Sequence, residues 1–342
     1  MSDALLSRPA GTAASASRRP RLRGLTWLMW RQNRLTFWIG LAVVVAVAGY
    51  AAIQHNHIAE AVVDQHLADC RATVAVTDMA PECASRLLAF GQKYQYPMRL
   101  PLQLMLVVPL IAGLFLGAPL MSQELESKTY RMVCTQSVTR LRWFAVKLGV
   151  PVVMTVVITG ILAAAMTWWW RPVSVLGDRF PWYDWYPFDG IGPVVVGQSV
   201  LLLLVGVTLG LVLRRTVLAM GATLAAGALV MYLLEQVRGH LLPMVTVTAQ
   251  HTTAAPSPDG FWAVSTGFLS ASGQRMPEVK ACFTATGGYE KCVFAHGRTG
   301  TWTDGHPASQ LWGIQWAEFG LCAVLAAVLA GVCVWWVRRR MV

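Results

Sequence analysis

The chain has 342 residues, of which 55% are hydrophobic and only 13% are charged. Soluble domains carry about a quarter charged residues, so this composition excludes an ordinary soluble globular domain. The formal net charge of +11 would suit nucleic acid, but the charges lie at the ends of apolar segments. The positive charge therefore indicates membrane topology, and we expect no nucleic-acid partner.

The amino-terminal region precedes the first apolar segment. Residues 1–21 are rich in Ala, Ser and Arg without periodicity, which predicts a disordered basic terminus. Residues 22–34 place apolar side chains on one face and end with Arg31 and Arg34, so we expect an interfacial elbow helix. The alternative is an ordinary basic flank. An Ala-Val-Ala sequence at residues 46–48 imitates a signal-peptidase site, but the basic region before it is too long, which favours a retained span.

Six uncharged stretches of 19 to 24 residues follow, and a helix needs about 20 residues to cross a bilayer. They are Leu35–Ile53, Leu100–Gln123, Leu148–Trp170, Ile191–Leu213, Thr216–Leu234 and Phe319–Val337. They lack the two-residue alternation of barrel strands. The sequence therefore predicts an all-α integral membrane protein with six transmembrane helices. Residues 35–234 hold the first five, and residues 319–342 hold the sixth and a basic tail.

Lys and Arg residues set the predicted orientation. With the amino terminus inside, 17 of the 28 Lys and Arg residues and only three of the 17 acidic residues lie on the cytosolic side. The inner and outer sides then carry charges of +14 and −3, as the positive-inside rule requires. We therefore expect a multi-pass protein of the cell membrane with both termini in the cytosol.

Two pairs of cysteines lie in the predicted external loops. The last of these loops, residues 235–318, is too long for a bare connection and is expected to be folded. Cys70 with Cys83 and Cys282 with Cys292 is the natural pairing among three, because an oxidising exterior permits disulfides. A zinc site is the alternative, although the spacing matches no standard ligand pattern. We predict two disulfides and no metal site.

The six stretches contain no Asp, Glu, Lys, Arg or His. Ion-driven transporters and intramembrane proteases normally keep such groups at depth, so both classes are disfavoured. The chain also has no Gly-Lys dipeptide, which the phosphate-binding loop of ATPases requires. We therefore expect no enzyme activity, and any energy for work comes from a partner.

Glycines and prolines recur in the spans next to the connection between the second and third. Gly113 with Gly117, and Gly206 with Gly210, have the four-residue spacing that allows close helix contact. Pro109 and Pro119 lie before this connection and weaken the helix locally. They act as hinges or as kinks that aid packing.

The predicted cytosolic connection, residues 122–142, is the place where a partner would bind. Glu124, Glu126 and Arg131 favour a short helix at the water surface, and residues 135–139 supply hydroxyl and amide groups for capping or contacts. The alternative is a solvated loop that only obeys the positive-inside rule.

This connection resembles that of the membrane permease subunits of type-2 ABC exporters, particularly a group common in actinobacteria. The matching residues are Gly117–Leu120, Glu124–Glu126, Thr129, Arg131, Thr135–Arg140, Arg142, Trp143 and Val146–Leu148. In such permeases the connection carries a coupling helix that inserts into a separate ATPase. The elbow segment, the six spans and the long external loop also match.

The resemblance implies a permease subunit of an ATP-driven exporter. The implied ATPase-coupling residues are Glu124, Glu126, Thr129, Arg131, Thr135, Gln136, Thr139 and Arg140. The implied partners are a cytosolic ABC ATPase, which holds ATP and Mg, and a second permease copy or a sister permease. The chain itself is expected to bind no cofactor. Its uncharged spans, in contact with membrane lipid, favour an apolar or amphipathic substrate.

Two other functions come from different classes. One is a membrane sensor or scaffold whose external loop binds a ligand or a protein, without a stable ATPase complex. The other is a membrane-bound enzyme with a site in the outer loops. That enzyme would need a convergent histidine set, and the histidines form no recognised catalytic motif. The candidates are His55, His57, His251, His296 and His306.

Overall fold

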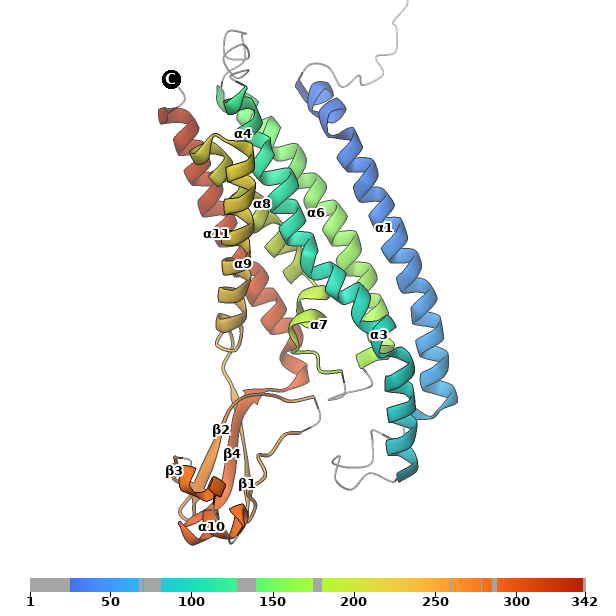
Figure 1. Cartoon of the computed structure of the whole chain (residues 1–342), viewed down its shortest axis with the longest axis vertical. Coiled ribbons are helices and arrows are strands. Elements are labelled where there is room, and N and C mark those ends of the chain that lie inside the picture. Colours follow the sequence, from blue (N-terminus) through green and yellow to red (C-terminus); the bar gives the residue numbers. More distant parts are fainter. Residues whose placement is uncertain are drawn as a thin grey trace, which may run out of the picture.

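The computed structural model describes residues 25–67, 70, 81–127, 140–174, 180–258, 260–277, 279–284 and 288–340. Within these residues, six helices are long and apolar enough to cross a membrane (Figure 1). The predicted helical membrane fold is confirmed. In chain order the spans are α1 (Leu25–Asp64), α3 (Pro81–Ile111) continued by the π-helical segment η1 (Ala112–Gly117) and α4 (Ala118–Glu126), α6 (Arg140–Val173), α8 (Val194–Leu213), α9 (Thr216–Arg238) and α11 (Leu311–Arg340).

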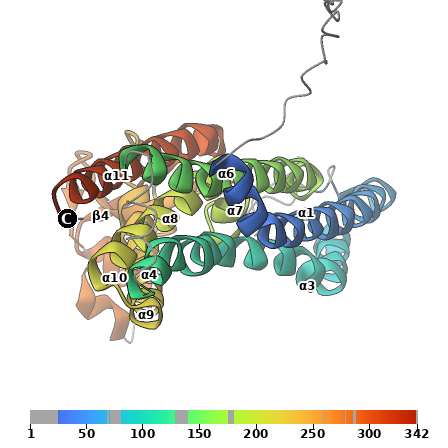
Figure 2. The same cartoon turned by 90° about the horizontal axis from the view of Figure 1, so that it is seen from above.

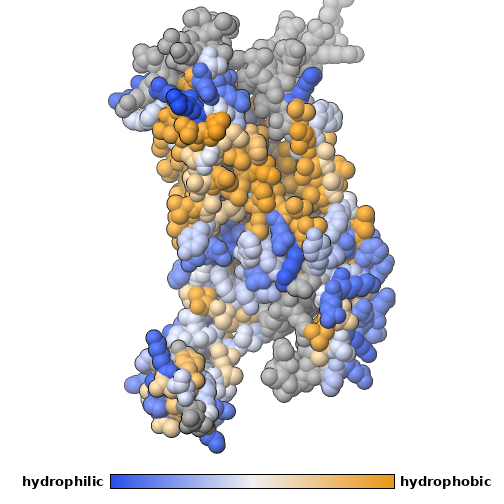
Figure 3. All heavy atoms as spheres, viewed as in Figure 1, coloured by the Kyte–Doolittle hydropathy of each residue, from blue (hydrophilic) through white to orange (hydrophobic). Residues whose placement is uncertain are grey.

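The bundle has two different ends (Figure 1). Helix α1 begins and α11 ends at one of them, together with α4; we call it the termini end. A small sheet lies at the other, which we call the sheet end. Between them an apolar band covers the surface (Figure 3). Exposed Leu35, Val153, Val217 and Val324 come from four different spans and belong to the lipid-facing side chains.

The helices are longer than the apolar stretches that predict them. Helix α1 continues to Asp64 and α3 begins at Pro81, so much of the predicted first external loop is helical. Hydropathy marks where lipid contact ends, whereas a helix continues while its residues favour it. The predicted separate elbow is also corrected, because residues 25–34 are the first turns of α1 itself.

Helix α8 lies at the centre of the bundle, against α11, α9, α6 and η1 (Figure 2). It is apolar on all sides and 72% of its span is buried, compared with 11–39% for the other five. Glycines allow α8 to pack closely against η1. A Cβ on Gly117 would lie 2.3 Å from the carbonyl oxygen of Leu203, and one on Gly206 would lie 2.4 Å from that of Gly113. The two predicted glycine pairs thus face each other.

A short buried helix, α7 (Trp185–Gly190), folds back into the sheet end before α8 begins. The turn between them needs glycine at position 192, where φ is +68° and a Cβ would lie 2.7 Å from Oε1 of Gln315. Gln315, from α11, donates from Nε2 to the carbonyl of Phe188 (2.7 Å) and accepts the amide of Val194 (3.2 Å). This one side chain therefore joins α7, the start of α8 and α11.

The long loop before α11 is folded, and it contains a sheet that the sequence did not predict. The strands β1 (Val245–Gln250), β2 (Trp262–Ser270), β3 (Arg275–Met276) and β4 (Arg298–His306) are antiparallel in the order β1-β4-β2-β3. The 3₁₀ segments η3 (Lys280–Thr284) and η4 (Ala308–Gln310) and helix α10 (Tyr289–Ala295) complete the loop. Trp182 donates a hydrogen bond to the carbonyl of Gly260 (2.8 Å), which joins the loop to the segment before α7.

The structure contains the two disulfides of the predicted pairing. Cys70 is bonded to Cys83 between α1 and α3, and Cys282 is bonded to Cys292 between η3 and α10. Among the described residues, the one group of three candidate metal ligands combines this second pair with His296. Because its two sulfurs are joined to each other, the arrangement agrees with the disulfide interpretation rather than a zinc site.

Candidate functional site

The predicted coupling residues fall partly within the described chain. Glu124 and Glu126 lie in the last turns of α4, and Arg140 is the first residue of α6. The remaining ones, Thr129, Arg131, Thr135, Gln136 and Thr139, lie outside the described residues. The helix ends on either side of them, the end of α4 and the start of α6, lie at the termini end of the bundle (Figure 1).

Glu124 joins the two helices on either side of this connection. Its carboxylate forms an ion pair with the ammonium group of Lys147 in α6. The Lys147 side chain is only 5% exposed, and its ammonium lies 5.2 Å from the centre of the Trp143 ring. A buried ammonium needs such partners because burial removes its hydration. The pair therefore fixes α4 against α6.

Glu126 binds the beginning of a third helix. Its Oε2 accepts the backbone N–H of Thr216 (2.9 Å) and the hydroxyl of the same residue (2.8 Å). Thr216 is the first residue of α9, where backbone N–H groups have no partner within the helix and a negative charge is favoured. Ser122 of α4 adds a hydrogen bond to the Thr216 hydroxyl (3.2 Å). Helix α4 thus caps α9 from outside.

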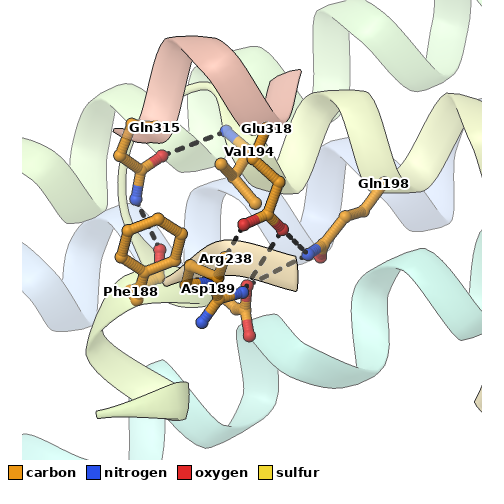
Figure 4. A network of polar contacts seen from close by, with 7 residues as sticks. All are labelled: Phe188, Asp189, Val194, Gln198, Arg238, Gln315 and Glu318. Carbon is orange, nitrogen blue, oxygen red and sulfur yellow. Dashed lines mark hydrogen bonds and ion pairs between the residues drawn. The ribbon is translucent and has the colours of Figure 1, made fainter. Parts of the chain in front are cut away.

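A second polar cluster lies buried at the sheet end, and we call it the buried network: Asp189, Gln198, Arg238 and Glu318 (Figure 4). Arg238 donates from Nε to Glu318 Oε2 (2.8 Å) and from Nη2 to Asp189 Oδ1. Gln198 donates from Nε2 to Asp189 Oδ1 (3.0 Å) and to Glu318 Oε1 (3.1 Å). The four side chains come from α7, α8, α9 and α11, so the network joins four helices.

Sequence reasoning missed this network and placed its charged members in the external loops. Arg238 is 2% exposed and Glu318 is 0% exposed, and both lie within helices that span the membrane. The six stretches are uncharged as described, but the full-length helices extend beyond them and contain these ionisable residues. Each of these residues lies just beyond an uncharged stretch, where hydropathy cannot distinguish a buried pair from a solvated loop. The Arg guanidinium also stacks on Phe188, 3.8 Å from its ring centre.

A groove of about 470 Å³ lies beside the network, between α3, α7 and α9. Its walls are mainly apolar and aromatic, with Trp185 and Tyr232 among them. Asp189 and Glu235 bring carboxylates to it. The buried network is therefore in contact with a space that reaches the surface.

The histidines of the enzyme hypothesis take part in separate local contacts. His55 stacks on Trp168 with ring centres 3.9 Å apart, and His306 contacts the carbonyl of Gly239 (3.0 Å). His296 lies beside the second disulfide. These contacts give each of the three a structural role.

Comparison with known proteins assigns the family. The sequence model of the family described as "ABC-2 membrane transporter related" matches residues 41–238. The chain belongs to this ABC-2 family. No curated protein and no solved structure was found to match it.

The matched region ends at the last residue of α9. It covers α4, α7, α8, α9 and most of α1, and so includes Glu124, Glu126 and three of the four network residues. The sheet and α11, with Glu318, follow the matched region. Membership identifies the chain as the membrane component of an ABC transporter and implies an ABC ATPase partner. The resemblance to an actinobacterial group stays a prediction.

Proposed function

We propose that the chain is the permease subunit of an ATP-driven ABC exporter, with its termini end in the cytosol. A separate ATPase subunit binds ATP and Mg and contacts the connection between α4 and α6. Movement of that connection switches the spans between inward-facing and outward-facing arrangements. The permease acts as a pair, with a second copy or with a sister permease.

The observation that carries this proposal is how the connection is anchored. Helix α4 ends at Glu126, which holds α9, and α6 begins about two turns before Lys147, which Glu124 holds. A force applied to the connection therefore acts on three spans together. A solvated loop with no mechanical role would need neither contact.

Helix α9 extends this link across the membrane. Its first residue, Thr216, is bound by Glu126, and its last, Arg238, is the centre of the buried network. Packed helices move as rigid elements, so a displacement of one end reaches the other. The network then passes it to α7 and α11, and the chain leads from α9 into the sheet.

These contacts change the role that we propose for the two glutamates. Both carboxylates are bonded within the chain, so Glu124 and Glu126 position the connection. Thr129, Arg131, Thr135, Gln136 and Thr139 remain the proposed contacts with the ATPase. Arg140, at the start of α6, joins them as a proposed contact with the ATPase.

The groove beside α9 supports an apolar or amphipathic substrate. Its apolar walls and its position between α3 and α9, the two helices linked through Glu126 and η1–α4, suit a cargo that enters from the lipid. The exposed apolar band on the bundle surface also implies contact with the surrounding membrane lipid.

Purification of the chain from its native membrane in mild detergent tests the proposal. We expect a stoichiometric ATPase to co-purify and to hydrolyse ATP. We expect the double variant Gln136→Ala, Arg131→Glu to bind this ATPase more weakly. Gln274→Ala, in the loop at the sheet end, is the matched control and should have no effect. A folded, monodisperse preparation without any ATPase would contradict the proposal and favour the sensor or scaffold function.

A further inference from the structure

The buried network contains one more acid than base. Asp189, Arg238 and Glu318 are 7%, 2% and 0% exposed, so an unbalanced charge among them has little contact with water. An uncompensated charge in such a place costs several kcal/mol, and buried groups respond by becoming neutral. We propose that the Asp189–Glu318 pair holds one shared proton at neutral pH.

The arrangement of the oxygens supports a shared proton. Asp189 Oδ1 and Glu318 Oε1 both accept from Nε2 of Gln198, at 3.0 and 3.1 Å, and both lie next to Nη2 of Arg238. The two carboxylate oxygens thus share both donors and occupy one site. When two carboxylates share a site, their mutual repulsion favours the state in which one of them is protonated.

The Gln198 amide is a neutral donor to both acids. Gln198 is 1% exposed, and its Oε1 has no hydrogen-bond partner although Nε2 of the same amide has two. Its two donor bonds hold both acids without supplying the second positive charge that a fully ionised pair would need.

Other charged groups near the network do not restore the balance. On α9, Glu235 lies one turn before Arg238 and is a further acid, and on α11 the thiol of Cys322 lies one turn after Glu318. On α3, Arg99 lies over the ring of Tyr186 in α7, 5.5 Å from its centre. Helix α8 contributes the neutral Gln198. Arg238 is the base with which Asp189 and Glu318 form ion pairs.

The groove provides a route for the proton. Asp189 and Glu235 both line it, so the pair lies beside a space that reaches the surface, through which its proton can exchange. Loss of the proton would place a net negative charge between α7, α8, α9 and α11 and weaken their packing. The network is thus a proton-binding site that couples helix packing to pH, whether or not an ATPase is bound.

Infrared difference spectroscopy of the purified chain tests this directly, since a protonated carboxyl has a C=O stretch that a carboxylate lacks. We expect this band in the wild type at pH 7 and its loss in both Asp189→Asn and Glu318→Gln, because either substitution leaves one acid balanced by Arg238. Glu235→Gln, on the same groove, is the matched control and should keep the band.

Two results of this experiment would contradict the proposal. Retention of the band in either single variant would contradict the charge-balance argument, as would its absence from the wild type. Both variants preserve side-chain shape. If one does not fold, titration of the wild type decides, since the band must be present at pH 7 and disappear at alkaline pH.

Discussion

At the termini end, the stability of the fold depends on the buried side chain of Lys147. Its 5% exposed ammonium has Glu124 as its ion-pair partner, and Oε2 of Glu124 is buried without a hydrogen bond. Lys147→Met leaves that carboxylate without its cation, and we expect a loss of about 3 kcal/mol in the free energy of unfolding. Thermal unfolding in detergent measures the loss.

A double variant separates the ion pair from packing. Lys147→Met combined with Glu124→Gln removes both charges and should recover most of the stability, which a double-mutant cycle would show as coupling. Equal stability of Lys147→Met and the wild type would show that the pair does not hold α4 against α6.

Asp304 gives the sheet a predictable pH dependence. Two hydrogen bonds from Arg275, at 2.8 and 2.9 Å, lower the pKa of the Asp304 carboxyl. Because the folded pKa lies below the unfolded one, the stabilisation is complete above the unfolded pKa of about 3.9 and is lost as the pH falls through the folded value. The Arg275 side chain is 52% exposed, so the effect stays under about 1 kcal/mol.

The comparison of Asp304→Asn with the wild type measures this effect. We expect the variant to be slightly less stable at pH 7, with a difference that shrinks as the pH approaches 3. Limited proteolysis of the loop that contains the sheet reports it. A difference that grows on acidification would contradict the assigned sign.

Residue-level prediction succeeded where spacing carries the information. The pairing of Cys70 with Cys83 follows from their short separation, and the structure contains it. Arg238 and Glu318 were placed in water because they lie just outside uncharged stretches, Arg238 after one and Glu318 before another. Their partners come from α7 and α8, far away in sequence, and only the tertiary fold shows that a charge beyond a span is paired and buried.

At the scale of elements, the contact between η1 and α8 is the tightest point of the bundle. A Cβ on Gly206 would lie 2.4 Å from the carbonyl oxygen of Gly113, so Gly206→Ala forces the two helices apart. We expect it to cost about 1–3 kcal/mol in detergent. Gly221→Ala in α9 is the matched control, since a Cβ there has nothing within 4 Å and alanine favours helix.

Equal unfolding temperatures of the two variants would contradict this packing. If Gly206→Ala and Gly221→Ala unfold at the same temperature, η1 and α8 are not in the close contact described. Mild destabilisation by Gly206→Ala alone, measured by thermal unfolding, supports it.

Elements were predictable to different degrees. Uncharged length identified all six spans, because lipid requires a continuous apolar surface. The sheet was not foreseen, because length alone was used to infer that the loop is folded. The alternation was there to be read, since β1 begins Val-Thr-Val-Thr and β4 has Thr at residues 299, 301 and 303. The short helix α7 was not foreseen either, because its Trp, Tyr and Phe residues near a span end also suit an interfacial belt.

At the scale of the whole molecule, α9 connects the two polar sites. Glu126 holds Thr216 at the termini end, and Arg238 holds Asp189 and Glu318 at the sheet end. The sequence predicted the number of membrane spans but not this link, because the link depends on contacts between α4, α9 and α11. Under the proposed function, ATP-driven movement reaches the sheet through α9.

Hydrogen–deuterium exchange of residues 235–250 in the purified permease–ATPase complex, with and without ATP, tests this link most directly. The Glu126→Ala variant removes the cap of α9 and should still fold and bind the ATPase. We predict an ATP-dependent change of exchange in the wild type and in the control Glu82→Ala, whose carboxylate is exposed on α3, and its loss in Glu126→Ala. An ATP-dependent change that persists in Glu126→Ala would contradict coupling through α9.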